Sequence, residues 1–479
     1  MCGVIGIFAD KPVAGDLYAS LVAIQHRGQD SAGIGTFDGR FNIHKGNGLA
    51  SQVFSPVILQ TLTGCSGIGQ VRYPTIGGGH ANDAQPILVT SPYGIAIVHN
   101  GNVTNYNTLK EELFRKSRRL LTTKNDVEAI LNVFADELHH LDGDGFSPEH
   151  VFQAVQGVFR RVKGAYSCIA IIAGKGMVAF RDPFGIRPLV MGKRGNDIAF
   201  ASESVALDFT DFKIDRDVKP GEAIFIDFAH HVHSKVVMEQ SHSPCIFEYV
   251  YFARPDSLMD DISVYKSRLR MGKELGKLWR QSGLEADVVI PVPDASRPAA
   301  LAFAEETGIK YRDGFVKNRY VGRTFIMPNQ HQRVRGVREK LNPIELEIRG
   351  KRIIVVDDSI VRGTTSRQIS RMLRNSGAEK VYFLITAPPI ISPCFYGIDM
   401  QTSSEFVAKG RTFDEIAKII EADAIIYQSK EGMVQSCQEG NPRISRFCAA
   451  CFDEHYPTGD ITPEIMANIE EERRCKPSS

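Results

Sequence analysis

The stretch 352-RIIVVDDSIVRGTTS-366 decides the fold of the second half of this chain. Four consecutive apolar residues at 353–356 predict a buried strand, which ends at two adjacent carboxylates, Asp357 and Asp358. A Gly-Thr-Thr turn follows and opens a helix that is predicted to extend to Asn375. A buried strand, a polar loop and a helix in this order are typical of the βαβ units that build a parallel sheet.

The same rhythm continues on the N-terminal side of this stretch. An amphipathic segment extends from about Ser263 to Trp279, and it is followed by 286-ADVVIPVP-293 and a helical segment through Ala304. The residues from Lys317 to Pro343 are rich in Arg, Gln and Asn, which predicts a loop over a site. The second half of the chain is therefore expected to be an α/β domain with a parallel sheet.

The first half has a different pattern. Up to about residue 235, short apolar runs such as 94-GIAIVHNG-101 and 221-GEAIFIDF-228 are bounded by Gly, Asn or Asp, which is typical of strands. Helical periodicity appears at about 126–138 and 148–162. We therefore expect a strand-rich α+β domain here, and 479 residues suffice for two or three domains of about 100–200 residues each.

Composition and charge argue against several classes of protein. The hydrophobic content of 43% and charged content of 24% are those of an ordinary globular chain, and a net charge of +1 provides no global field for nucleic acid or anionic lipid. No apolar run approaches the roughly 18 residues of a membrane span, and the N-terminus lacks a signal-peptide pattern. We expect no nucleic-acid or membrane partner and a cytoplasmic protein, or an organellar one if a transit peptide is missing from the sequence.

The turn after Asp358 is suited to phosphate binding. Backbone N–H groups at a helix start, the helix dipole and the hydroxyls of Ser359, Thr364 and Thr365 can converge on an anion. The two adjacent carboxylates can hold ribose hydroxyls or Mg²⁺. The sequence contains no GxxxxGK[ST] motif, so this turn is not a P-loop. The alternative is that two acids at a strand end form only a solvated cap.

Cys2 is a candidate nucleophile because it follows the initiator methionine and is small enough to permit removal of Met1. A free α-amine has a pKa of about 7.7–8.0 and a thiol one of about 8.5, so the amine could act as general base for the thiol of the same residue. A retained Met1 would leave Cys2 without this base. The alternative is that Cys2 is merely a small residue at the start of a strand.

Five motifs of the first half resemble the glutaminase domain of the N-terminal-nucleophile amidotransferases, which has an αββα fold. They are 2-CGVIGIF-8, 25-QHRGQDSAGIG-35, 69-GQVRYPT-75, 99-HNGNVTNY-106 and 122-TTKNDVEAI-130. The resemblance implies that Cys2 attacks the side-chain amide of glutamine, forms a thioester and releases ammonia. It also implies an oxyanion hole formed by Asn100 and the N–H of Gly101, and glutamine binding by Arg27, Gly28, Arg72 and Asp126. His26 and His99 are expected to be structural, since the α-amine is available as base.

Three segments of the second half resemble type I phosphoribosyltransferases. The run 352–366 resembles their phosphoribosyl-pyrophosphate fingerprint, 289-VIPVPDASRPAA-300 their pyrophosphate loop, and 317-KNRYVGRTFI-326 with residues 333–343 their flexible catalytic loop. The resemblance implies that Asp357 and Asp358 contact ribose and Mg²⁺, and that the following residues cradle the 5′-phosphate. The implied contacts of phosphoribosyl pyrophosphate are Asp294, Ser296, Lys317, Asp357, Asp358, Ser359, Ile360, Val361, Arg362, Gly363 and Thr364. Ala295 occupies a position where the family usually carries a hydroxyl, so a side-chain metal ligand from this loop stays open.

Both halves, with the connecting 247-FEYVYFARPDS-257, resemble the amidophosphoribosyltransferase family from Cys2 to about Tyr456. The resemblance implies a glutaminase domain at 2–235, a phosphoribosyltransferase domain at 245–460 and a helical tail at 461–479. It implies the first committed step of purine synthesis, inhibition by purine nucleotides and a homo-oligomer, either a dimer or a tetramer. Because free ammonia is mostly protonated at neutral pH, closure of the 317–343 loop is expected to form a water-excluding passage between the two sites.

The nine cysteines are too few for a disulfide framework in a chain of this length. Taken alone, Cys448-Ala-Ala-Cys451 fits a redox pair, half a zinc site or part of an iron–sulfur site. Cys245 and Cys394 lie where the iron–sulfur-containing branch of the family carries ligands, and four thiolates suit zinc or a [4Fe–4S] cluster. The resemblance implies a [4Fe–4S] cluster that acts as a structural element. The cysteines without such a match are Cys65, Cys168, Cys437 and Cys475.

Two rival functions share part of this pattern. An amidotransferase of glucosamine-phosphate or asparagine synthesis would share the Cys2 domain but not the fingerprint at 352–366. A regulatory protein that binds phosphoribosyl pyrophosphate without chemistry would not need Cys2, Arg72, Asn100 and Asp126 together.

Overall fold

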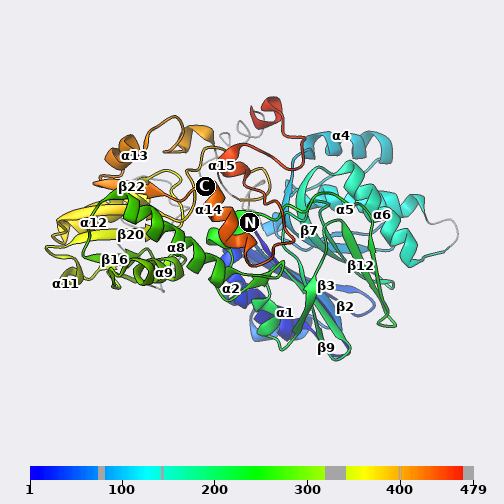
Figure 1. Ribbon diagram of the computed structural model, residues 1–479. Coiled ribbons are helices and arrows are strands. Elements are labelled where there is room, and N and C mark those ends of the chain that lie inside the picture. Colours follow the sequence, from blue (N-terminus) through cyan, green and yellow to red (C-terminus); the bar gives the residue numbers. More distant parts are fainter. Residues whose placement is uncertain (74–80, 142–144, 319–340, 399, 401, 468–479) are drawn as a thin grey trace.

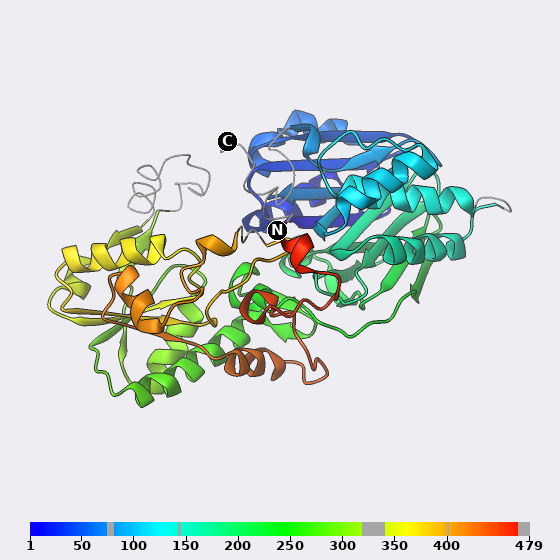
Figure 2. The same ribbon diagram turned by 90° about the horizontal axis from the view of Figure 1, so that it is seen from above.

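The computed structural model describes residues 1–73, 81–141, 145–318, 341–398, 400 and 402–467. These residues form two domains that lie side by side, with the N-terminus and the last described segments between them (Figures 1 and 2). None of the helices in these residues is both long and apolar enough to cross a membrane.

Two antiparallel sheets form the N-terminal domain. Among the described residues, the strand order of the first sheet is β11 (Lys213–Asp217), β9 (Val190–Arg194), β10 (Asp197–Ala201), β1 (Gly3–Phe8), β4 (Ser66–Arg72), β2 (Ser31–Phe37) and β3 (Phe41–Asn47). The order of the second is β13 (Val232–Val236), β12 (Glu222–Asp227), β8 (Gly176–Arg181), β7 (Gly164–Ile172), β6 (Ile95–Val103) and β5 (Ile87–Val89).

The two sheets pack face to face, and helices cover their outer faces. Strand β1 shows why: Val4 and Phe8 point into the core between the sheets, whereas the alternate residues Ile5 and Ile7 pack towards helix α1. The helices of this domain are α1 (Ala14–Ala23), α2 (Ala50–Val53), α3 (Pro56–Thr61), α4 (Tyr106–Ser117), α5 (Val127–His140), α6 (Pro148–Arg161) and α7 (Val205–Asp208), with 3₁₀ turns η1 (Gln25–Arg27) and η2 (Ala81–Asp83). The arrangement is the expected αββα fold.

A parallel sheet forms the centre of the C-terminal domain. Its strand order is β17 (Lys310–Tyr311), β16 (Val288–Pro291), β20 (Arg352–Asp357), β21 (Lys380–Ile385) and β22 (Ala424–Tyr427), and each neighbouring pair is parallel. Further elements are β14 (Leu258–Met259), β15 (Ile262–Ser263), β18 (Phe315–Lys317), β19 (Leu341–Pro343), α8 (Val264–Ser282), α9 (Arg297–Thr307), α11 (Glu345–Ile348), α12 (Thr364–Asn375), η4 (Ser403–Glu405), α13 (Phe413–Ile419), α14 (Lys430–Gln438) and α15 (Ala450–Asp453).

Strand β20 is apolar on both faces because helices cover both sides of the parallel sheet. Ile353 and Val355 pack in the core that contains residues of α12 and α13, and Ile354 and Val356 pack in the core that contains residues of α8 and α9. The strand and the helix predicted from 352–366 are both present, and α12 ends at Asn375 as expected. The expected α/β domain is confirmed.

A further core joins the domains. It contains residues of the π-helical turn η3 (Glu248–Phe252), of 387–398 and of 444–456, together with Met400 and with Met1 and Ile186 of the N-terminal domain. The predicted loop at 317–343 lies outside the described residues from 319 to 340, and the predicted tail lies outside them from 468 onwards.

Candidate active site

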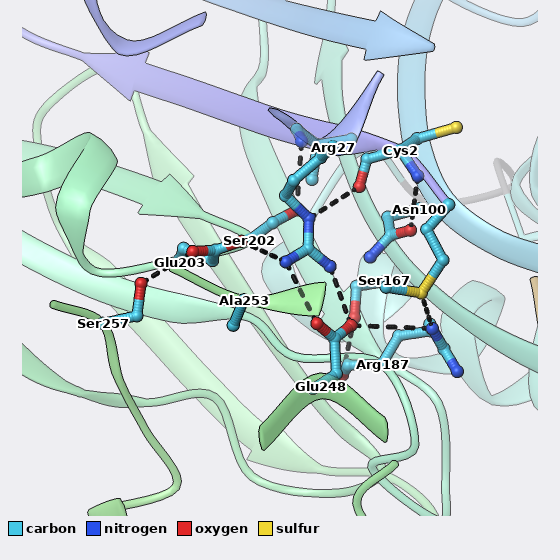
Figure 3. Close-up of polar contacts among 12 residues, drawn as sticks. Cys2, Arg27, Asn100, Ser167, Arg187, Ser202, Glu203, Glu248, Ala253 and Ser257 are labelled. Atoms are coloured by element: carbon cyan, nitrogen blue, oxygen red, sulfur yellow. Dashed lines mark hydrogen bonds and ion pairs between the residues drawn. The ribbon is translucent and has the colours of Figure 1, made fainter. Parts of the chain in front are cut away.

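Cys2 lies immediately before β1, at the boundary between the two domains. Its side chain is nearly buried, with 7% of its surface exposed. Its backbone N–H donates a hydrogen bond to Oδ1 of Asn100 at 3.1 Å, and its Sγ lies 3.8 Å from the carbonyl oxygen of Tyr73. Figure 3 shows the thiol pointing away from the Arg27 guanidinium on the other side of the residue.

Asn100 contacts the backbone of Cys2 through its Oδ1, and its Nδ2 points away from the thiol (Figure 3). Strand β6 holds Asn100 fully buried, and its Nδ2 has no hydrogen-bond partner among the described residues. The next residue, Gly101, passes so close to β7 that an added Cβ would lie 2.1 Å from the carbonyl oxygen of Ala165. A buried amide donor without a partner is costly unless a ligand uses it, and an oxyanion hole requires such a donor. The predicted pair of Asn100 and Gly101 is therefore next to Cys2.

Arg72 and Asp126 are brought together by β4 and by the start of α5. Asp126 accepts a hydrogen bond from the N–H of Val103 at 3.0 Å, and its Oδ1 lies 3.4 Å from Nε2 of His99. Burial alone would raise the pKa of Asp126, but His99, this hydrogen bond and Arg72 together lower it below its ordinary value. Asp126 is therefore ionised at neutral pH, as binding of an ammonium group requires, although glutamine contacts of Arg72, Asp126 and Gly28 stay predictions.

Arg27 is engaged in a different way from its predicted role. The side chain is fully buried, and its Nε donates to the carbonyl oxygen of Cys2 at 3.0 Å. Its Nη1 and Nη2 bind the carboxylates of Glu203 and Glu248 (Figure 3). These contacts position the backbone of Cys2, and a direct contact of Arg27 with glutamine stays a prediction.

Glu203, Glu248 and Arg187 lie around this arginine, and no motif in the sequence predicts them. Arg187 is fully buried, its Nη1 lies 3.6 Å from Glu248, and its guanidinium also contacts the sulfur of Met1. Met1 itself is only 2% exposed. The nearest signal in the sequence was a glutamate, Glu248, within the apolar run 247-FEYVYF-252, since a charge in such a run implies a buried partner. Nε2 of His26 donates to the Glu203 carboxylate at 2.7 Å, which fits its expected structural role.

The predicted sugar-phosphate residues gather at the carboxyl edge of the parallel sheet. Pro291 of β16 pairs with Val356 of β20, so the loops after these two strands lie side by side. The Asp294 carboxylate forms an ion pair with Nζ of Lys317 at 2.7 Å, and Ser296 of the same loop is buried. Ligands of open parallel sheets bind at this edge, between neighbouring loops.

The loop from Asp358 to Thr364 leads from β20 into α12. Ser359 Oγ donates to Asp358 at 2.7 Å, and Arg362 is paired with Glu405 at 2.8 Å. Gly363 has φ +73°, and this left-handed conformation at the helix cap favours glycine. Ile360 is buried in the core, so only its backbone is available to a ligand, as is typical of a phosphate cradle.

The two acids of this loop have unusual proton affinities. Burial raises the pKa of Asp357 well above its usual range, and the charge of Asp358 adds to this. Burial also raises the pKa of Asp358 to about 6. Carboxylates that hold a proton this strongly need a cation to stabilise their charged forms, which fits the predicted Mg²⁺ site.

The four predicted cluster ligands lie in the core between the domains. The backbones of Cys245 and Cys448 pair in an isolated parallel β-bridge, in which the N–H of Ile246 donates to the carbonyl oxygen of Cys448 at 3.1 Å. Burial raises the pKa of Cys245 to about 11 and that of Cys451 well above its usual value, and the neighbouring cysteines add to both shifts. Among the described residues, no three His, Cys, Asp or Glu side chains already converge in the geometry of a metal site. The four thiols are therefore buried in one core without the arrangement of metal ligands, and the cluster stays a prediction.

Known proteins resemble this chain over nearly its whole length. A family model for a glutamine amidotransferase domain matches residues 75–209. The amidophosphoribosyltransferase of Pasteurella multocida is 50% identical, and the match covers 99% of this chain and 96% of that protein. The glutamine phosphoribosylpyrophosphate amidotransferase of B. subtilis, solved in complex with ADP and GMP, has a TM-score of 0.85 and 38% identity over 95% of this chain and 97% of that one.

A second solved structure, described as the allosteric regulatory enzyme of purine biosynthesis, has a TM-score of 0.87 and 38% identity over 98% of this chain and 99% of its own. Identity of this level over both domains exceeds what a shared fold alone requires. The chain belongs to the amidophosphoribosyltransferase family.

Proposed function

We propose that this chain transfers ammonia from glutamine to 5-phosphoribosyl 1-pyrophosphate, giving 5-phosphoribosylamine, glutamate and pyrophosphate. The observation that carries the proposal is the pairing of Cys2 with Asn100, whose Oδ1 binds Cys2 N–H while its buried Nδ2 stays free among the described residues. In the same chain, a carboxylate pair and a helix start form a second site suited to a sugar phosphate.

The first half-reaction uses the residues around Cys2. After removal of Met1, the α-amine of Cys2 accepts the thiol proton, and the thiolate attacks the amide carbon of glutamine. Asn100 Nδ2 donates to the developing oxyanion. The α-ammonium of Cys2 returns its proton to the leaving nitrogen, so that collapse of the intermediate releases ammonia and leaves a thioester. Water then attacks the thioester, which releases glutamate and regenerates the thiol.

The second half-reaction takes place at the edge of the parallel sheet. The 359–364 loop holds the 5′-phosphate, and ammonia attacks the anomeric carbon from the face opposite the pyrophosphate, so the configuration inverts. Mg²⁺, held by Asp357 and Asp358, would offset the charge that develops on the departing pyrophosphate. Lys317, whose Nζ contacts Asp294, would add a positive charge on the side of the departing pyrophosphate.

Assays with single substrates test this function against its rivals. We expect glutamate release with glutamine alone, and phosphoribosylamine only when phosphoribosyl pyrophosphate is added with glutamine or ammonia. Binding of the sugar phosphate without any ammonia release would instead favour a regulatory protein. Ammonia transfer to fructose 6-phosphate or aspartate would favour one of the other amidotransferases.

Replacement of Asn100 by alanine tests the oxyanion hole. We expect kcat for glutamine hydrolysis to fall about 10²–10³-fold with little change in KM, because the donor acts mainly on the charge that forms in the transition state. Asn42→Ala is the control, since that amide is partly exposed in the same domain and bonds to Asp38 and Thr63. An equal loss in both variants, or a change in KM alone, would contradict the assignment.

We further propose that Cys245, Cys394, Cys448 and Cys451 hold a [4Fe–4S] cluster between the domains. The support is that all four thiols are buried in one core and that the Arg187 cation lies near Cys245, Cys394 and Cys448, where it would stabilise thiolates. Zinc is the alternative that the same donor set allows.

Metal analysis of protein purified without oxygen separates these two cases. We expect about four irons and four sulfides per chain, both lost in Cys448→Ser/Cys451→Ser together with several degrees of thermal stability. Cys65→Ser is the control, because this thiol is exposed and lies outside the cysteine group. One zinc per chain, or neither metal, would overturn the cluster.

Inhibition by purine nucleotides and a homo-oligomeric state, dimer or tetramer, are also part of the proposal. The B. subtilis relative solved with ADP and GMP supports the inhibition, whereas the oligomeric state rests on the family resemblance alone. Steady-state assays with AMP and GMP, and light scattering with and without them, measure both properties directly.

A further inference from the structure

The turn η3 links the two domains and is held from both sides by buried arginines. Glu248 and Tyr249 are 2% and 1% exposed, so their polar groups must be satisfied within the protein. Arg27 of the N-terminal domain binds the turn from one side, and Arg268 of helix α8 binds it from the other.

On the side of the N-terminal domain, two successive hydrogen-bonding contacts connect the turn to Cys2. The Glu248 carboxylate accepts hydrogen bonds from Nη2 of Arg27 at 2.7 Å and from Nη1 at 3.1 Å. Nε of the same guanidinium donates to the carbonyl oxygen of Cys2 at 3.0 Å. Because a guanidinium is planar and rigid, a displacement of Glu248 would be passed to the backbone of Cys2.

The second carboxylate on Arg27 is tied to the same linker. Glu203 binds Arg27, and its Oε2 accepts from the hydroxyl of Ser257 at 2.7 Å and from the N–H of Arg254 at 3.0 Å. Both carboxylates that orient Arg27 therefore depend on the segment from Glu248 to Ser257.

On the C-terminal side, Arg268 holds both ends of the turn. It is 2% exposed, its Nε donates to the carbonyl oxygen of Tyr249 at 2.9 Å, and its Nη2 donates to that of Ala253 at 2.7 Å. Burial lowers the pKa of Arg268 to about 10, and Asp358 is the carboxylate that opposes this shift most. The sugar-phosphate loop also joins this core directly, because the N–H of Ala387 donates to the carbonyl oxygen of Asp358 at 3.1 Å and Ala387 packs in the same core as Tyr249 and Ala253.

We propose that Arg268 and Glu248 are positioning residues that couple occupancy of the phosphoribosyl site to the placement of Cys2, through the turn η3. A cation and an anionic substrate at Asp358 change the field on Arg268, whose hydrogen bonds to Tyr249 and Ala253 fix the turn. The displaced turn then moves Glu248, Arg27 and the Cys2 backbone together. A tenfold effect of this kind requires only about 1.4 kcal/mol of coupling. The inference rests on the proposed function, since it needs both half-reactions.

The experiment compares Arg268→Lys and Glu248→Gln with the wild type in the full chain. Arg268→Lys keeps the positive charge but loses the planar pair of donors. Glu248→Gln keeps the shape and removes the charge on Arg27. Glu222→Gln is the matched control. Glu222 also forms a bidentate pair with an arginine, Arg216, at 2.7 Å, but in the N-terminal domain and outside η3.

Three rates are measured for each protein: glutamate release without phosphoribosyl pyrophosphate, the same rate with it, and phosphoribosylamine formation from ammonia. We expect the sugar phosphate to stimulate glutamate release in the wild type and in Glu222→Gln. In Arg268→Lys the stimulation should fall below twofold, while the unstimulated rate stays within about twofold of wild type. In Glu248→Gln the kcat of glutamate release should fall about tenfold, with the ammonia-dependent rate unchanged.

The outcomes distinguish a failure of the coupling from a failure of the proposed function. Stimulation of wild-type size in both variants would overturn the coupling route, and so would an equal loss of all three rates, which indicates a purely structural role. A wild-type protein that releases glutamate with no stimulation would also overturn it. No glutamate release from the wild type would instead overturn the proposed function.

Discussion

Cys2→Ala is expected to reduce glutamine-dependent synthesis by a factor on the order of 10⁴ or more, because no other group can form the thioester. Synthesis from added ammonia should stay within about twofold of wild type, since the phosphoribosyl site lies in the other domain. Glutamate release and phosphoribosylamine formation, measured on the same preparation with glutamine or ammonium chloride, give both values.

The control for this prediction is Cys65→Ala, which removes an exposed thiol from the same domain. It should leave both rates unchanged. If Cys2→Ala retained glutamine-dependent synthesis, or lost the ammonia-dependent rate to the same extent, Cys2 would be a structural residue at the start of β1.

Asp358→Asn is expected to reduce synthesis by about 10²–10³-fold with either nitrogen source, since a lost metal or ribose ligand costs roughly 3–4 kcal/mol in the transition state. Cys2 should still be alkylated by iodoacetamide in this variant, which shows that the other domain is folded. The pattern is therefore the converse of that for Cys2→Ala.

We expect the Mg²⁺ requirement of synthesis to depend on pH, because burial raises the pKa of Asp358 to about 6. Below that pH the carboxyl of the free protein is protonated and must lose its proton before Mg²⁺ binds, so the Mg²⁺ requirement should rise as pH falls. Asp358→Asn should lose this dependence. The control is Asp423→Asn, because Asp423 pairs with Arg374 and Lys380 away from the carboxyl edge of the sheet. A similar loss in the control would contradict the site.

Local pattern predicted most of the elements that position the two sites. The strand 352–357, helices α5, α6 and α12, and the parallel sheet all follow from runs of apolar residues with clear boundaries. Helices α1 and α4 were missed. In α4 only Leu109 and Leu113 are buried, so its helical signal is one i, i+4 pair in a polar segment, and packing against the domain stabilises it.

The motif residues of the candidate site were predictable, whereas the network that orients them was not. Asn100 follows from a motif, whereas its contact with Cys2 follows from the packing of β6 in one sheet against β1 in the other. Glu203 and Glu248 meet Arg27 across 176 and 221 residues of chain. No periodicity or spacing signals a contact over such a distance, and Glu203 lies in a loop without a distinctive pattern of its own.

The burial of Met1 constrains when the protein can mature. A methionine aminopeptidase needs an accessible N-terminus, yet only 2% of Met1 is exposed, and the core around it includes segments as late as 387–400 and 444–456. At roughly 5–20 residues per second, those segments leave the ribosome about 20 seconds or more after the N-terminus. If Cys2 acts through its free α-amine, Met1 must be removed during that interval. A chain that folds with Met1 in place would have an inactive glutaminase site.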